Sequence, residues 1–233
     1  MTESGRNLDF EKWALEFNDI DGGNPEADIW ICGIEPGGLL SENLIYNESR
    51  RENSGIPYWN DDFRKTLKDE NLNVWYFEQR VVKLLLGLNK IQTSNIEEFI
   101  QNKLYDEQGV CFKMNLYPLN CENLSVWTKK HVTLSGFEDK ESYYAWCRKY
   151  RYSKLAELVQ RFSPPVLICT GKNCWDEFIA AFGTEKCNTE LERSKNIISL
   201  PDSPLILTRH FNNRFSEDKE EIIEAVKSKL SGS

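Results

Sequence analysis

The feature that most constrains the fold is a short apolar run that ends abruptly in a glycine-rich loop. The run from Ile29 to Gly33 is too short for a helix and is bounded by breakers, so it is predicted to be a buried strand. The loop that follows places Glu35 beside Pro36, which stiffens the turn, and Gly37, which lets a ligand approach the main chain. Three later stretches repeat the pattern of an apolar run followed by polar or aromatic groups.

The repeated pattern predicts four strands that alternate with helices. The strands are expected over residues 28–34, 110–115, 166–171 and 205–208, and 197–200 is a candidate edge strand. Helical patterns cover residues 7–20, 60–70, 75–88, 95–104 (capped by Ser94), 139–161, 172–182 and the stretch after Ser216. Near-continuous apolar strands alternating with helices are typical of a parallel sheet covered on both faces. We therefore expect one domain over residues 1–233, with a three-layer α/β/α architecture and a mainly parallel four-stranded sheet.

Polar groups follow each of the four predicted strands. In open parallel sheets, ligands bind outside the carboxyl ends of the strands. The four strands deliver Glu35, Asn115, the turn at Gly171 and His210 to that one edge. The edge is therefore the expected functional site.

Composition limits the class of protein. The chain has 233 residues, of which 40% are hydrophobic, which is enough for one sizeable core. It contains no run of 18 apolar residues and no basic N-terminal segment followed by an apolar one, so we expect a cytoplasmic protein without a membrane span. A net charge of −8 argues against a nonspecific nucleic-acid coat, but it permits a local basic patch around Lys172, Arg209 and Arg214.

The seven cysteines include no Cys-x-x-Cys pair. Cys32, Cys111 and Cys169 lie inside apolar runs, where a reduced cysteine behaves as a small hydrophobic residue. Disulfides are rare in the cytosol, so unpaired core thiols are expected. The clustered spacing of a zinc or iron–sulfur site is absent, and we expect no metal and no cofactor.

Four segments, at residues 33–37, 55–58, 115–119 and 210–214, together carry a resemblance. They resemble the uracil-DNA glycosylase superfamily, most of all its single-strand-selective monofunctional and mismatch-specific branches. Gly33-Ile34-Glu35-Pro36-Gly37 is similar to the Gly-x-Asn-Pro-Gly loop that holds the catalytic water. Gly55-Ile56-Pro57-Tyr58 is similar to the segment whose aromatic ring stacks on the extruded base. Asn115-Leu116-Tyr117-Pro118-Leu119 resembles the strand end whose Asn reads the base. His210-Phe211-Asn212-Asn213-Arg214 resembles the closing loop, which is His-Pro-Ser-Pro-Arg in its familiar form.

The resemblance implies a DNA-repair enzyme, a monofunctional glycosylase that excises uracil or a related damaged base from DNA. The roles that it implies are catalytic for Glu35 and His210, base-binding for Asn115, Tyr58, Gly33, Pro36 and Gly37, and phosphate-binding for Arg214 and Lys172. The implied partners are single- or double-stranded DNA with a damaged base and the free nucleobase product. No membrane, metal or cofactor is implied, and the enzyme is expected to be a monomer.

Two departures from the family pattern leave other functions open. The closest branches have Asn where this chain has Glu35, and Phe211-Asn212-Asn213 replaces the Pro-Ser-Pro that stiffens the closing loop. One alternative is a catalytically altered or inactive module that binds a base, a nucleotide or a partner. The other is a hydrolase of small nucleotides that uses Glu35 as its base and the helix near Lys172 for phosphate.

Each candidate residue also has a structural interpretation. Glu35 can cap a helix that follows its loop, because carboxylates favour helix N-termini. Asn115 and Asn120 can be turn residues beside Pro118, and Asn120 is the substitute candidate for reading the base. A solitary histidine such as His210 is often structural, and His131, in a polar segment without a motif, is expected to be solvated.

Overall fold

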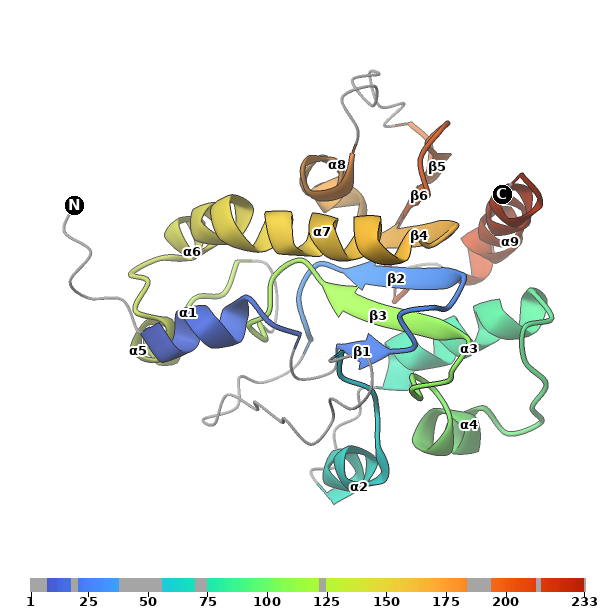
Figure 1. Cartoon of the computed structure of the whole chain (residues 1–233), viewed down its shortest axis with the longest axis horizontal. Helices are drawn as coiled ribbons and strands as arrows, with labels where there is room; N and C mark the ends of the chain where they lie inside the picture. Colours follow the sequence, from blue (N-terminus) through green and yellow to red (C-terminus); the bar gives the residue numbers. More distant parts are fainter. Residues whose placement is uncertain are drawn as a thin grey trace.

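In the computed structural model of the protein, residues 8–17, 21–37, 56–69, 75–121, 125–183, 194–212 and 215–232 are described. Over these residues the chain has an α/β fold, in which helices flank a six-stranded, mostly parallel sheet (Figure 1). The phosphate-binding candidate Arg214, and Gly55 at the start of the aromatic motif, lie outside the described residues.

The sheet contains the four expected parallel strands in its centre. Its six strands are β1 (Gly22–Gly23), β2 (Ile29–Gly33), β3 (Cys111–Asn115), β4 (Val166–Thr170), β5 (Ile197–Ser199) and β6 (Leu205–Thr208). Their order is β1-β3-β2-β4-β6-β5, and the neighbours among β3, β2, β4 and β6 are all parallel. The predicted parallel core is therefore confirmed.

The sheet has two strands more than the four expected: β5 confirms the candidate edge strand at 197–200, and β1 at the other edge was not predicted. β1 pairs antiparallel with β3, and β5 pairs antiparallel with β6. β1 consists of two glycines, Gly22 at φ 137° and Gly23 at φ 121°, so no apolar pattern signals it. A Cβ atom at position 23 would clash with the carbonyl oxygen of Cys111, so only glycine lets the chain approach β3 this closely.

Side chains alternate between the two faces of the sheet, as the strand period requires. Trp30 and Cys32 point into one apolar core, and Ile29 and Ile31 into the other. The first core is covered by α1 (Leu8–Ala14), α6 (Lys140–Trp146), α7 (Tyr152–Phe162) and α8 (Trp175–Phe182). The second is covered by α2 (Asp61–Asp69), α3 (Trp75–Gly87), α4 (Ile96–Asn102) and α9 (Phe215–Ser231). Both faces of every central strand are buried, which explains the uninterrupted apolar runs.

The predicted helix over 139–161 is interrupted by a π-helical stretch, Cys147–Arg151, between α6 and α7. The stretch turns the Arg151 side chain into the interior, where it is 1% exposed. Insertions of this kind are often found at functional sites.

Smaller differences concern the helix ends. The N-cap of α4 is Asn95 and not Ser94, because the Asn95 side chain accepts a hydrogen bond from the Glu98 amide at 3.1 Å. The predicted helix from Lys172 begins as a 3₁₀ turn, Lys172–Cys174, before α8. A short helix that the pattern did not predict, α5 (Lys129–Ser135), follows Thr128.

The six described cysteines are all free, as expected for core thiols. None of the helices in the described part of the chain is long and apolar enough to cross a membrane.

Candidate functional site

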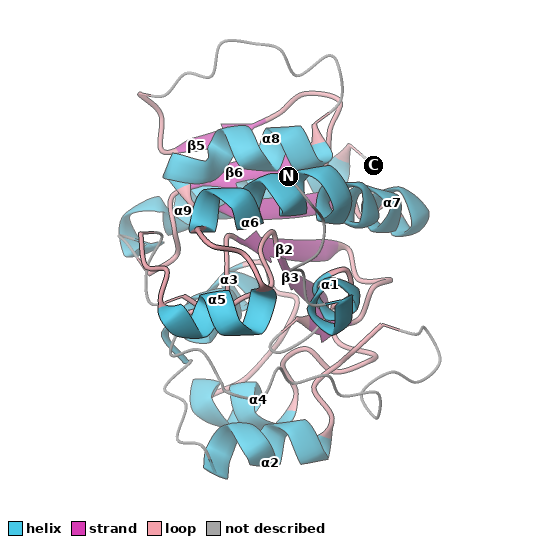
Figure 2. Cartoon of the chain, turned by 90° about the vertical axis from the view of Figure 1, so that its left-hand side faces the viewer, coloured by secondary structure: helices cyan, strands magenta, loops and turns pink. Residues whose placement is uncertain are grey.

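The loops that follow β2 and β3 are joined at the carboxyl edge of the sheet. The arrowheads of β2 and β3 point to the left in Figure 1, so Figure 2, which turns that side to the viewer, looks onto this edge, with α5 and α6 in front. Beyond the strand register that pairs Gly33 with Asn115, the Leu116 amide donates to the Gly33 carbonyl at 3.0 Å. The Tyr117 amide donates to the Ile34 carbonyl at 2.9 Å. The two candidate motifs are therefore held side by side by main-chain bonds.

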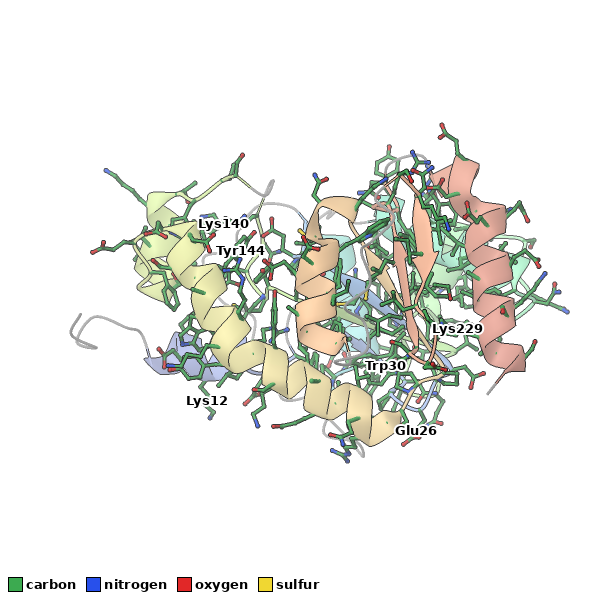
Figure 3. All side chains as sticks on the ribbon, turned by 90° about the horizontal axis from the view of Figure 1, so that it is seen from above. Lys12, Glu26, Trp30, Lys140, Tyr144 and Lys229 are labelled. Carbon is green, nitrogen blue, oxygen red and sulfur yellow. The ribbon has the colours of Figure 1, made fainter. Side chains whose placement is uncertain are left out.

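Glu35 is bound by side chains of α6. Lys140 Nζ lies 3.1 Å from Glu35 Oε2, and the Tyr144 hydroxyl donates to the same oxygen at 3.2 Å. Figure 3 shows Lys140 and Tyr144 together at one end of the molecule. Burial raises the pKa of Glu35, whose side chain is 6% exposed, while the Lys140 ammonium opposes that rise. Glu35 is thus a desolvated carboxylate with a fixed counter-ion and not a helix cap in solvent.

Cys121 lies beside Glu35 and contacts His131 in turn. Cys121 Sγ is 3.5 Å from His131 Nε2, and burial raises the Cys121 pKa to about 11, so the sulfur remains a neutral thiol at neutral pH. The expectation that His131 is solvated is wrong, because it is 3% exposed. Its Nδ1 accepts from the Thr128 amide at 3.1 Å, which binds the ring to the start of α5.

Asn115 lies at the end of β3 and is 2% exposed. Its Nδ2 donates to Asp21 Oδ1 at 2.7 Å. A Cβ atom at position 33 would clash with Asn115 Oδ1, so the glycine of the first motif makes room for the amide of the third. Pro36 is buried and its carbonyl accepts from the Cys121 amide at 3.3 Å. By contrast, a Cβ atom at Gly37 would meet no described atom within 4 Å.

Arg151 binds the main chain at the end of β3 and the side chain of Asp21. Its guanidinium donates to main-chain carbonyls of both the N-terminal segment and the β3 end, and these belong to Ala14, Glu16, Asn115 and Leu116. Its Nη2 also lies 3.5 Å from Asp21 Oδ2, and both side chains are 1% exposed. Asp21 is therefore paired in charge with Arg151 and bonded to Asn115 at once.

His210 follows β6 and is half-buried. Its Nδ1 accepts a hydrogen bond from the Asn212 amide at 3.2 Å, so the proton of the neutral ring is on Nε2. The ring lies 5.8 Å from that of Phe77. Burial and the nearby charge of Lys113 lower the His210 pKa. The imidazole is therefore a neutral donor through Nε2 at neutral pH.

Lys113 forms a second buried ion pair beside His210. Its Nζ is 2.6 Å from Glu78 Oε1, and the two side chains are 4% and 0% exposed. The same Nζ lies 4.8 Å from the centre of the Phe77 ring. The pair thus joins β3 to α3, next to the Phe77 ring that contacts His210.

The remaining predicted residues are less closely tied to the site. Tyr58 is half-buried, and the bond from the Gly23 amide to the Pro57 carbonyl, 2.9 Å long, places this segment beside β1. Lys172 Nζ donates to the Lys195 carbonyl at 2.6 Å, next to the Trp175 ring.

The structure brings Gly33, Glu35 and Asn115 to adjoining positions and places His210 on the same edge, two strands from β2. In the described part of the chain, no hydrogen bond joins any two of the side chains of Glu35, Tyr58, Asn115 and His210. Each is instead held by its own partners.

Sequence reasoning missed those partners, namely Asp21, Arg151, Lys140 and Tyr144. Asp21 and Asn115 are 94 residues apart, and Lys140 and Glu35 are 105 residues apart. The one local signal was the position of Lys140 and Tyr144 on a single helix face, four residues apart.

A surface hollow lies at the opposite, amino edge of the sheet, between Ser163, Pro204 and Lys229 among others. Lys229 Nζ donates there to the carbonyls of Leu200 and Ser203, at 2.9 and 2.6 Å. Figure 3 shows Lys229 far from Lys140 and Tyr144. The hollow shares no residue with the carboxyl edge, where the candidate catalytic groups lie.

No protein-family model matches the chain, and no curated protein matches it. Among the described residues, no group of three or more His, Cys, Asp or Glu side chains is placed to hold a metal ion.

Proposed function

We propose that this chain is a monofunctional DNA glycosylase, which hydrolyses the N-glycosidic bond of uracil or a related deaminated base in DNA. The observation that carries the proposal is the contact between the glycine-rich Glu35 loop and Asn115, where Gly33 makes room for the amide. His210 on the same edge adds a hydrogen-bond donor. The order of the parallel strands, β3-β2-β4-β6, supports a uracil-DNA glycosylase-like fold. DNA as the substrate and a monomer as the working unit are part of the proposal.

The reaction needs a base taken out of the helix stack and held by its edge and faces. As the bond between C1′ and the base nitrogen breaks, its electron pair leaves with the base and positive charge builds on the sugar. Glu35, a carboxylate desolvated by its surroundings, favours that charge and takes a proton from the water that attacks C1′. Lys140 and Tyr144 hold the carboxylate in one orientation during this step.

His210 stabilises the departing base. The Asn212 bond uses Nδ1, so Nε2–H remains to donate to a base oxygen, where negative charge accumulates. The lowered pKa keeps this ring neutral, so it donates a hydrogen bond without transferring its proton.

Two further groups recognise the substrate. Asn115 offers an acceptor and a donor to the base edge, and Tyr58 covers its face, a contact worth about 1–3 kcal/mol per base. Lys172 and Arg214 are assigned to the phosphates beside the lesion.

The test is a panel of single- and double-stranded oligonucleotides that carry uracil, hypoxanthine, xanthine or a thymine mismatch. Wild-type protein is expected to give an alkali-labile product from the uracil strand. Glu35→Gln is expected to slow cleavage of the uracil strand by about 10²- to 10⁴-fold with DNA binding retained. The variant keeps the shape of the side chain but cannot accept a proton from the attacking water. The matched control is Glu26→Gln, at an exposed position away from the site. Cleavage of none of the substrates would contradict the proposal.

A second function is favoured by the ion pair of Glu35 with Lys140, because an engaged carboxylate is less available to activate water. On this alternative the carboxyl edge of the sheet binds a base, a nucleotide or a partner without turnover, or acts on a small nucleotide. Binding of uracil or uridine without cleavage of DNA would select the binding module, and turnover of free nucleosides would select the hydrolase.

A further inference from the structure

Asp21 determines the orientation of the Asn115 side-chain amide, that is, on which side its oxygen and its nitrogen lie. An amide side chain can rotate by half a turn and exchange its oxygen and its nitrogen at almost no steric cost. A carboxylate only accepts hydrogen bonds, so the Asn115 group at 2.7 Å from Asp21 Oδ1 must be the NH₂. The oxygen of Asn115 therefore lies on the side of Gly33. One buried neighbour thus selects one of two amide orientations.

Arg151 keeps Asp21 in the accepting state. It lies 3.5 Å from Asp21 Oδ2, and a guanidinium is always a donor. Because the other donors of Arg151 are bound to main-chain carbonyls, the guanidinium cannot turn away from Asp21 without leaving those carbonyls unpaired.

The orientation of Asn115 decides which base edge fits. The amide offers an acceptor on the Gly33 side and a second N–H from Nδ2, whose first N–H is bound to Asp21. This pattern matches a base edge on which an N–H donor lies next to a carbonyl, as in uracil. Cytosine presents the reverse, a ring nitrogen acceptor next to an amino group, and would place like groups together.

We infer, on the basis of the glycosylase function proposed above, that Asp21 is a positioning residue that sets base specificity by holding the Asn115 amide in the uracil-reading orientation. The substrate class is then a base with an imide-type edge, and rejection of cytosine depends on a residue that touches no substrate.

The substitution Asp21→Asn tests this in an unusually direct way. Arg151 will bind the oxygen of the new amide, which leaves its NH₂ facing Asn115. Asn115 must then turn its oxygen toward position 21 and its NH₂ toward Gly33. The preference is measured as the kcat/KM for a uracil-containing strand divided by the kcat/KM for a cytosine-containing strand. This ratio is expected to fall by about 100-fold or more. The control Asp28→Asn changes an exposed carboxylate that pairs with Lys90, and the ratio is expected to stay unchanged.

A second measurement does not depend on the variant. In wild-type protein with ¹⁵N-labelled asparagine side chains, free uracil is expected to shift the Asn115 Nδ2 signals and free cytosine is not. A folded Asp21→Asn protein that cleaves uracil with an unchanged ratio would overturn the role of Asp21 and leave the glycosylase function standing. If wild-type protein cleaves no oligonucleotide but binds uracil in preference to cytosine, and Asp21→Asn loses that preference, the glycosylase function is overturned and the role of Asp21 stands. If it neither cleaves DNA nor distinguishes the two free bases, both are overturned.

Discussion

Two buried ion pairs lie beside β3, namely Arg151 with Asp21 and Lys113 with Glu78. They differ in how many of their polar atoms have hydrogen-bond partners. Arg151 binds Asp21 and also donates to four main-chain carbonyls. Lys113 donates to Glu78 Oε1, but in the described part of the chain Glu78 Oε2 has no hydrogen-bond partner. The hydroxyl of Tyr105, whose ring lies 5.7 Å from Lys113 Nζ, has none either.

The difference separates two uses of buried charge. A network in which every donor has an acceptor fixes one geometry, and the Arg151 network does this for Asn115. A buried pair with unsatisfied atoms adds little net stability and is costly to break, so the Lys113 pair is replaceable as a unit. Its charge still matters locally, since it lowers the pKa of His210.

The largest effect is expected for Arg151→Met. It leaves Asp21 buried without a counter-ion and removes the donors of four carbonyls, which should lower the free energy of unfolding by about 3–5 kcal/mol. Urea denaturation measures this. The matched control is Arg148→Met, because Arg148 pairs with Glu141 and Glu177 at a partly exposed position, and about 1 kcal/mol or less is expected there. Equal losses for the two variants would remove the special role of Arg151.

The second prediction distinguishes the two networks by rescue. Lys113→Met alone should cost about 3–5 kcal/mol, since it leaves the Glu78 charge buried and unpaired. The double variant Lys113→Met, Glu78→Met should recover most of that loss. The corresponding pair Arg151→Met, Asp21→Asn should recover little, because the four carbonyls remain without their donor. Equal recovery in the two double variants would contradict the distinction.

The third prediction concerns the two glycines of the Glu35 loop. Gly33→Ala pushes a methyl group against Asn115 Oδ1, and overpacking of this kind costs about 1–3 kcal/mol. It should also reduce cleavage of a uracil-containing strand, since Asn115 has to move. Gly37→Ala meets no described atom and should change unfolding by less than about 0.5 kcal/mol. A tolerated Gly33→Ala in both assays would show that the amide has room to shift.

The smallest effect is a pH dependence at His210. Burial and Lys113 lower its pKa in the folded protein below the ordinary value of 6.5. The neutral ring therefore contributes stability that is present above pH 6.5 and is lost as the pH falls through the folded-state pKa. Unfolding free energies from about pH 8 to about pH 5 should fall less steeply for His210→Gln than for wild type. His131, whose pKa burial also lowers, remains in both proteins and provides the shared background. Parallel curves would show that His210 titrates as it does in the unfolded chain.

The sequence by itself determined the central strands, their parallel arrangement and the edge at which Glu35, Asn115 and His210 are found. Such features are readable because burial on both faces imposes an uninterrupted apolar run, and each run is a local property of five or so residues. The strand β1 was not predicted, because two glycines carry no hydrophobic signal. The π-helical stretch was not predicted either, because in the sequence Arg151 cannot be distinguished from a surface arginine of a helix.

Only the tertiary structure decided what each candidate side chain touches. Asn115 meets Asp21 across 94 residues, Arg151 meets Asp21 across 130, and Glu35 meets Lys140 across 105. Contacts of this kind depend on how helices and loops pack around the sheet, and no periodicity within one segment encodes them. The orientation of the Asn115 amide is therefore set by packing and not by the motif that contains it.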